Sequence, residues 1–367
     1  MIYIFLFTIS LLLFKLSILN KENKIFANLL TFVAVLLPIT IGGLRDSNVG
    51  TDVSCYVEPL YNNASTSIDF NDYNSRIQYM DIEPLFAVVV YVGSLISDKI
   101  QGCLIIIEGL CLFFTVMAIK RNGNDKYIVP CMIIYYLYLY NMSFNLMRQL
   151  LSASVFLFAY VMYLEKKYVK FIILCVLGFL FHKSIIFGVF LLLGSDVFSR
   201  NKSNIKWLVL FFVLYIIINP NTIVRFVIEF SLFNHYETYL LGNDVLAGGT
   251  NITSFLVRIF IMCLVVYSYI NQMLSKIEFD KLMFFLLFEV FLLAFSSSLG
   301  TFSRLYIYAT ALEIMYVPYL LHKLKKTRMS FLCIISCYAL IIFQWYWLQI
   351  YNNSNETAEY SSQILGL

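Results

Sequence analysis

Residues 101–119 read QGCLIIIEGLCLFFTVMAI, and this stretch decides the class of fold. It contains one charged residue, Glu108, which we expect to act as a local anchor or as a polar group in helix packing. A helix needs about 20 apolar residues to cross the hydrocarbon core of a bilayer. The stretch therefore predicts a transmembrane helix.

Comparable apolar runs recur along the chain of 367 residues, and several are shorter than a full span. Hydrophobic residues make up 60% of the sequence and charged residues only 13%, whereas soluble proteins carry about 25% charged residues. A soluble enzyme and a disordered chain are therefore excluded, and the short alternating segments of membrane barrels are absent. We predict an all-α polytopic membrane protein with about 12–13 transmembrane or partly inserted helices, at 1–19, 25–43, 82–97, 101–119, 127–141, 150–164, 168–181, 184–196, 206–219, 251–270, 281–297, 304–321 and 329–347.

Lysine and arginine in short loops predict the orientation, because basic loops stay in the cytoplasm. Such residues cluster in the loops at 120–126, 166–170, 200–206, 276–281 and 323–328. The alternate loops then face outside, and they include the polar loops 44–81 and 220–250 and a polar tail at 348–367. Residues 1–347 are predicted to form a single transmembrane domain.

The segment 82–97 conflicts with this alternation, because two full crossings between 44–81 and 120–126 would leave both loops on one side. The segment is short, begins with Glu83-Pro84 and contains Gly93. We predict that it dips into the membrane without crossing it. The alternative, in which 44–81 lies in the cytoplasm, stays open.

A polar cluster follows the second apolar run and reads RDSNVGTD over residues 45–52, with Tyr56 close behind. Gly50 permits a tight turn and a close approach of the backbone to a ligand. Arg45 and Asp52 are suited to an anionic, hydroxylated substrate. The alternative is an ordinary polar turn at the membrane boundary.

Two further candidates lie in short outer turns. Arg148, followed by Gln149, is either a functional residue or an interface anchor, although anchors of this kind favour the cytoplasmic side. His182 interrupts two apolar halves, and an ionisable group at such a break marks a candidate functional site. Histidine also transfers protons near neutral pH. The alternative is that His182 is a packing residue whose ring is satisfied by hydrogen bonds.

Arg258 and Arg304 lie within and at the end of later apolar segments. Arginine binds phosphate oxygens with two parallel hydrogen bonds and stays charged when desolvated. Several arginines near one membrane face suggest a lipid phosphate or pyrophosphate. A structural ion pair with Glu289 or Glu313 is the alternative for Arg258.

Asp81 and Glu83 resemble the paired acids that hold a divalent ion in some sugar transferases. A pair of acids occurs often by chance, and no cluster of histidine and cysteine accompanies it. We therefore predict no metal site.

In their order along the chain, these motifs resemble those of the EpsG-like polysaccharide polymerases, a branch of the Wzy O-antigen polymerases. The match covers nearly the whole chain. The residues that carry the resemblance are Arg45, Gly50, Thr51, Asp52 and Tyr56, the pair Arg148 and Gln149, the run 181–184, and the late group Arg304, Leu305 and Tyr308.

The resemblance implies a multi-pass glycosyltransferase of the bacterial inner membrane, similar to the membrane-embedded (GT-C-like) glycosyltransferases. Such enzymes join oligosaccharide repeat units carried on undecaprenyl pyrophosphate into O-antigen or exopolysaccharide at the periplasmic face, without a metal or other cofactor. The implied partners are the lipid-linked oligosaccharide, membrane lipids and, optionally, a chain-length regulator protein. No nucleic acid is expected.

Pyrophosphate is already a good leaving group, so catalysis needs charge stabilisation on it and a base for the acceptor hydroxyl. We expect His182 first and Asp52 second as the base. The residues expected to bind pyrophosphate are Arg45, Arg148, Arg258 and Arg304, and those expected to bind sugar are Thr51, Tyr56 and Gln149.

Three other functions stay open. An O-antigen ligase would use the same donor with a lipid A-core acceptor. A polysaccharide flippase should show duplicated halves, and no repeat is visible in the sequence. A membrane acyltransferase would also use a histidine but has no need for so many outward arginines.

Overall fold

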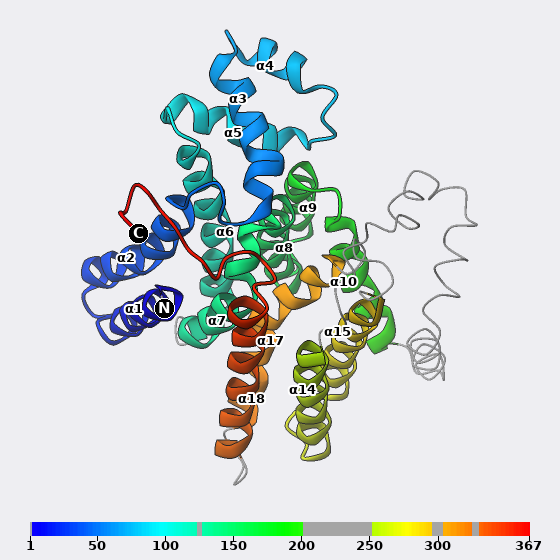
Figure 1. Ribbon diagram of the computed structural model, residues 1–367. Coiled ribbons are helices and arrows are strands. Elements are labelled where there is room, and N and C mark those ends of the chain that lie inside the picture. The colour runs from blue at the N-terminus through cyan, green and yellow to red at the C-terminus, as the bar shows by residue number, and fades with distance from the viewer. Residues whose placement is uncertain (1, 123–126, 201–251, 296–303, 325–329) are drawn as a thin grey trace. The chain divides into compact units, whose positions relative to one another are not determined.

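The computed structural model describes residues 2–122, 127–200, 252–295, 304–324 and 330–367 (Figure 1). Within these ranges every regular element is a helix, which confirms the predicted all-α polytopic membrane fold. Among them, six helical segments are long and apolar enough to span a membrane: Ile2–Leu19, Lys24–Gly43, Gln101–Arg121, Met147–Leu164, Ile252–Ile270 and Ser330–Tyr351. The predicted segment 206–219 and the predicted outer loop 220–250 lie outside the described residues.

The chain divides into two compact units. Unit 1 comprises residues 1–186 and 345–367, and unit 2 comprises residues 187–344. The single domain expected over 1–347 stays a prediction.

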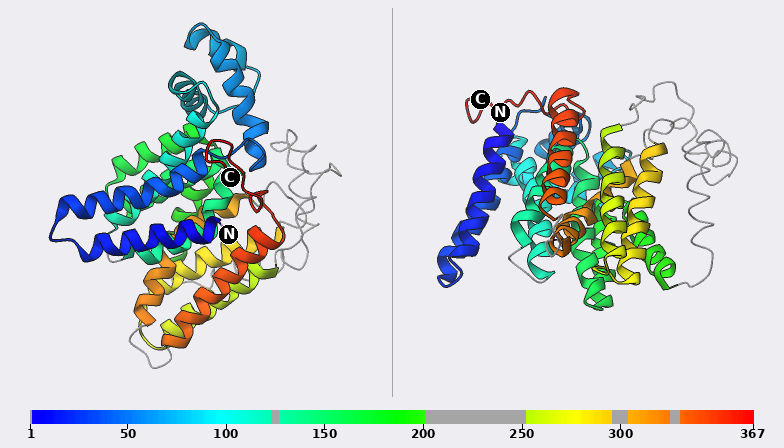
Figure 2. Two further views of the ribbon diagram at one scale, coloured as in Figure 1. Left: turned by 60° about the vertical axis from the view of Figure 1, so that its left-hand side comes forward. Right: turned by 90° about the horizontal axis from the view of Figure 1, so that it is seen from below.

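In unit 1, α1 (Ile2–Leu19) and α2 (Lys24–Gly43) form an antiparallel hairpin (Figure 2). With 18 residues, α1 is about 27 Å long, close to the hydrocarbon thickness of about 30 Å. The outward faces of both helices are apolar, with Phe5 70% and Phe32 61% exposed. Such surfaces suit contact with lipid.

The centre of unit 1 consists of α6 (Gln101–Arg121), α8 (Met147–Leu164) and α9 (Tyr168–Phe181). α6 packs against α2 and α8, and α8 packs against α9. α7 (Ile128–Tyr135) continues through the π-helix η3 (Tyr136–Tyr140) and the 3-10 helix η4 (Asn141–Phe144). Tyr136 of η3 stacks on Phe7 of α1 with ring centroids 4.7 Å apart. Aromatic packing therefore ties this irregular segment to the first helix.

The two ends of unit 1 differ in chemistry. At one end, here called the basic end, Arg121 of α6 bonds to Glu165 after α8 at 2.9 Å, and Lys167 bonds to the same carboxylate. Two of the loops predicted to be cytoplasmic therefore lie together. The opposite end, here called the site end, carries residues 44–56, 81–83, 145–149 and 182–184.

α5 (Pro84–Ile96) has 13 residues, so it is about 20 Å long and too short to span. Both of its ends lie at the site end. Glu83, just before α5, contacts Arg148 at the start of α8, and Gly93 packs on Cys103 in the first turn of α6. That 82–97 dips into the membrane without crossing it stays a prediction.

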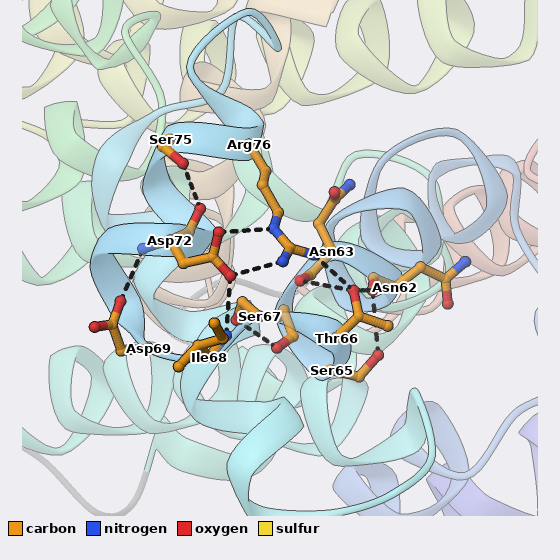
Figure 3. Close-up of polar contacts among 11 residues, drawn as sticks. Asn62, Asn63, Ser65, Thr66, Ser67, Ile68, Asp69, Asp72, Ser75 and Arg76 are labelled. Atoms are coloured by element: carbon orange, nitrogen blue, oxygen red, sulfur yellow. Dashed lines mark hydrogen bonds and ion pairs between the residues drawn. The ribbon is translucent and has the colours of Figure 1, made fainter.

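The polar stretch 44–81 is largely helical, with a π-helix η1 (Val53–Val57), α3 (Glu58–Thr66) and α4 (Phe70–Ile77). A polar network closes the α3–α4 turn (Figure 3). Arg76 donates two hydrogen bonds to Asp72, at 3.0 and 2.7 Å, and a third to Thr66 at 3.0 Å. The bonds from Arg76 hold the pKa of the Asp72 carboxyl below its usual range. α3 also packs against α5, so the hairpin belongs to the site end.

The C-terminal segment, which follows the π-helix η7 (Tyr346–Tyr351), is bound to the loop after α2. Ser362 Oγ donates to the Leu44 carbonyl at 2.6 Å, and the Gly50 N–H donates to the Glu356 carbonyl at 3.2 Å. These hydrogen bonds with the C-terminal segment therefore hold the polar cluster 45–52 in place.

Unit 2 contains α14 (Ile252–Ile270), α15 (Lys276–Phe295), the 3-10 helix η6 (Arg304–Tyr306) and α17 (Ile307–Leu324). α14, α15 and α17 pack pairwise against one another. Most of α10 (Ile185–Arg200) and of α18 (Ser330–Trp345) also belongs to this unit.

Candidate active site

The loop 45–52 depends on a glycine at position 50. Gly50 has φ +89°, and a Cβ there would lie 2.5 Å from the Phe144 carbonyl oxygen. Only glycine combines this conformation with so close an approach. Next in the chain, Thr51 donates to Asn145 Oδ1 from its N–H at 2.6 Å and from its hydroxyl at 3.1 Å. The loop is thereby fixed beside the turn that precedes α8.

Asp52 lies at the N-terminus of α8. Its Oδ2 accepts a hydrogen bond from the N–H of Met147, the first residue of that helix, at 3.2 Å. The first N–H groups of a helix have no partner within the helix and favour negative charge. This environment supports an ionised carboxylate that orients the loop.

Arg148 is the centre of the charged cluster. Its Nη1 donates to Glu83 Oε2 at 2.8 Å, and its guanidinium carbon lies 4.2 Å from the centroid of the Tyr56 ring. The side chains of Arg148 and Glu83 are 14% and 7% exposed. A charge-assisted bond and an aromatic face therefore fix the arginine in a largely desolvated position. Gln149, the next residue on α8, is buried.

Glu83 connects Arg148 with the His182 turn. Its Oε1 accepts from the Lys183 N–H at 3.4 Å and lies 3.9 Å from His182 Nε2. The sequence indicated Glu83 as half of an acid pair and as the start of the segment 82–97, but not this connection. The available signal was Pro84, because a proline at the first helical position marks the start of α5 directly after Glu83.

The second acid of that pair, Asp81, is also matched by a cation. Lys183 Nζ lies 2.9 Å from Asp81 Oδ1. The hydrogen bond and charge of this ammonium group hold the pKa of Asp81 below its usual range. Asp81 and Glu83 thus pair with different basic side chains, Lys183 and Arg148.

His182 lies in the three-residue turn between α9 and α10. Its Nδ1 is 2.6 Å from Ser184 Oγ and accepts from the Ser184 N–H at 3.2 Å. Ser152 of α8 donates to the carbonyl oxygens of Gly178 and His182, at 2.9 and 3.4 Å. The turn is therefore held against α8, with the imidazole half-buried beside Glu83.

Arg45 lies below this cluster, with a fully buried side chain. It pairs with Glu108 of α6 at 3.1 Å, donates to the Gly42 carbonyl and lies over the Phe144 ring. Ser143 also donates to Glu108, at 2.9 Å. Glu108 thus has the helix-packing environment expected from the sequence. The burial of Arg45 favours a role in holding the loop rather than in contact with a ligand.

Arg258 has a similar environment in unit 2. It bonds to Glu289 at 2.7 Å and to Gln344 at 2.8 Å, and it lies 3.3 Å from Glu313. The ion pair that the sequence left as the alternative for Arg258 is therefore present. Arg304, on η6 of the same unit, is exposed.

The structure thus brings six of the nine sequence-predicted site residues to the site end of unit 1: Thr51, Asp52, Tyr56, Arg148, Gln149 and His182. Arg45 lies beneath them, and Arg258 and Arg304 belong to unit 2. A fixed arginine, a histidine and two carboxylates at one end of apolar helices suit a phosphate-bearing substrate and proton transfer.

Fold and site together define a multi-pass, all-α membrane protein with a charged site at one end of its helices. The EpsG family model matches residues 28–362, so the chain belongs to the EpsG family. This is a family of Wzy-like polysaccharide polymerases, which confirms the resemblance drawn from the motifs. The searches among curated proteins and among solved structures gave no match.

Proposed function

We propose that the protein joins oligosaccharide repeat units carried on undecaprenyl pyrophosphate, at the periplasmic face of the bacterial inner membrane. The observation that carries the proposal is the fixed Arg148 beside His182 at the site end. The growing chain leaves its own carrier and is transferred to the next lipid-linked unit, so the reaction uses no nucleotide sugar. A chain-length regulator in the same membrane is a further proposed partner.

Arg148 is the proposed pyrophosphate ligand. Among the described residues, its hydrogen-bonded carboxylate partner is Glu83, which accepts a hydrogen bond from Nη1. The edge formed by Nε and Nη2 suits two parallel hydrogen bonds to a phosphate. Tyr56 supports this orientation by stacking on the guanidinium. Charge that develops on the leaving pyrophosphate is then stabilised by a donor that is already in place.

The other arginines receive different roles in this proposal. Arg45 and Arg258 are buried with carboxylates and stabilise their own units. Arg304 is exposed and stays the second arginine proposed for phosphate. For the sugars, Thr51 and Tyr56 are the proposed contacts, because both lie on the loop and η1 beside Arg148, and Gln149 supports them from α8.

His182 is the proposed base, with Asp52 as an orienting carboxylate. Histidine ordinarily titrates near pH 6.5, so it is largely neutral at pH 7 and can accept a proton. Asp52 accepts a hydrogen bond from the Met147 N–H at the start of α8, and this contact suits a carboxylate that orients the loop. The base removes the proton of the acceptor hydroxyl as that oxygen attacks the anomeric carbon.

Deletion of the gene, followed by gel analysis of the surface polysaccharide, tests the proposal. A polymerase defect leaves lipid A-core or carrier capped with single repeat units, and the wild-type gene restores the ladder. Uncapped lipid A-core together with long carrier-linked chains would instead indicate a ligase. Accumulation of repeat units on the cytoplasmic side would indicate a flippase.

A further inference from the structure

The turn that contains His182 fixes the protonation of the imidazole ring. A backbone N–H can only donate, and the Ser184 N–H points at Nδ1 from 3.2 Å. Nδ1 must therefore carry a lone pair, and the proton of the neutral ring lies on Nε2. Nε2 faces Glu83, whose Oε1 is 3.9 Å away. A carboxylate on that side stabilises the same tautomer.

The Ser184 hydroxyl is then the donor to the ring. Its oxygen lies 2.6 Å from Nδ1, and Nδ1 has no proton to give. The Ser184 hydroxyl thus donates to Nδ1 of His182, and Nε2 on the other side of the ring lies 3.9 Å from Glu83 Oε1, close enough for an electrostatic contact but too far for a hydrogen bond. A hydroxyl, a base and an acid that orients the base are the parts of an activated-hydroxyl site.

We propose that Ser184 relays the proton of the acceptor sugar to His182, and that Glu83 is a positioning residue for this step. The proposal rests on the proposed function. Nδ1, which carries the lone pair, is engaged by Ser184, and Nε2 lies on the side of Glu83. A substrate hydroxyl therefore reaches the lone pair of the ring through the serine oxygen.

The step is balanced in atoms and charge. The acceptor oxygen forms a bond to the anomeric carbon, and the bond from that carbon to the pyrophosphate oxygen breaks, with its electron pair leaving on the pyrophosphate. The acceptor proton passes to Ser184 Oγ while the serine proton passes to His182 Nδ1. The resulting imidazolium is stabilised by Glu83 and later returns its proton to water.

Glu83 also links this relay to the proposed phosphate ligand. One of its oxygens bonds to Arg148, and the other faces His182 and the Lys183 N–H. Loss of the Glu83 carboxylate should therefore disturb both phosphate binding by Arg148 and proton transfer to His182. Loss of the Ser184 hydroxyl should disturb only proton transfer. This difference makes the two variants distinguishable.

Two substitutions of Ser184 separate the relay from a structural role. Ser184 directly precedes α10, where serine, threonine and asparagine all serve as helix caps. Ser184→Thr keeps the cap and the hydroxyl, and Ser184→Asn keeps the cap but cannot relay a proton. With purified protein and synthetic lipid-linked repeat units, we expect kcat to fall about 10²- to 10⁴-fold in Ser184→Asn, with KM little changed. In Ser184→Thr we expect kcat to fall less than about tenfold.

The pH profile gives a readout that a purely structural role would not move. Wild-type kcat should fall at acidic pH, because an imidazolium ring cannot accept a proton. This acidic limb of the pH profile of kcat should be lost in Ser184→Asn. If Ser184→Asn keeps wild-type kcat and the same limb, or if a glycosyl group is trapped covalently on Ser184, the relay is overturned.

A second measurement tests the geometry without any activity. Nitrogen NMR of protein labelled on histidine should show His182 as the Nε2–H tautomer, with its signals assigned by their loss in His182→Gln. A His182 that is Nδ1–H would overturn the inference. If the wild-type protein forms no polymer while this tautomer is present, the proposed function fails and the hydrogen-bond geometry stands.

Discussion

Arg148 and Glu83 are 65 positions apart in the sequence and form an ion pair at 2.8 Å at the site end of unit 1. The pair joins the first turn of α8 to the residue just before α5. Since Glu83 also faces the His182 turn, one carboxylate positions both the proposed phosphate ligand and the proposed base.

Replacement of Arg148 by lysine should impair the enzyme although the charge is kept. Lysine lacks the planar fork and cannot bond to Glu83 and to two phosphate oxygens together. We expect kcat/KM to fall about 10- to 100-fold, the loss of roughly one charge-assisted hydrogen bond. Arg121→Lys, in the exposed ion pair at the basic end, is the matched control and should keep full activity. Equal activity of both variants would remove Arg148 from the site.

Replacement of Glu108 by glutamine should destabilise unit 1, because the fully buried Arg45 would lose its compensating charge. Removal of one partner of a buried ion pair costs about 3–5 kcal/mol. Thermal unfolding in detergent should show a clear fall in midpoint, and the exposed Glu165→Gln should change it far less. A double variant, Arg45→Met with Glu108→Leu, should recover much of the loss. An unchanged midpoint in Glu108→Gln would show that Arg45 does not depend on the pair.

Gly50→Ala should distort the loop that carries Thr51 and Asp52. A Cβ would lie 2.5 Å from the Phe144 carbonyl, at a φ of +89° that alanine disfavours. We expect strongly reduced polymer formation at normal expression. Gly109→Ala is the control, since its nearest new contact is 3.9 Å away and alanine favours the helix. Normal activity of Gly50→Ala would show that the loop geometry is not required.

Labelling of cysteines tests the proposed topology. Cys55 is exposed on η1 and should react with a membrane-impermeant thiol reagent in intact spheroplasts. In a background without Cys55, Arg121→Cys at the basic end should react only after lysis. The reverse pattern would place the loop 44–81 in the cytoplasm and contradict a periplasmic site.

The helices of this fold were predictable because lipid requires long apolar runs with internally bonded backbone. The predicted 168–181 matches α9, and 101–119 lies within α6. The helical nature of 53–77 was not predictable from hydropathy, because its polar helices are held by contacts such as Arg76 with Asp72 and Thr66. Periodicity does not reveal bonds of that kind.

The site was predictable in part for a related physical reason. Residue type and order identified Arg148 and His182, since ionisable groups in apolar surroundings are few. Burial is not readable from type alone, so Arg45 and Arg148 looked equivalent in sequence, although the Arg45 side chain is fully buried and that of Arg148 is 14% exposed. The roles proposed for Glu83 and Ser184 were not predicted, because they depend on contacts with His182 that only the folded chain supplies.

The most direct test of the central claim is a count of products from purified protein in lipid vesicles, supplied only with a lipid-linked repeat unit. Wild-type protein should extend the chains and release one undecaprenyl pyrophosphate for each unit joined, and His182→Gln should do neither while staying folded. Chain growth without release of the carrier pyrophosphate, or full activity of His182→Gln, would contradict the proposed mechanism.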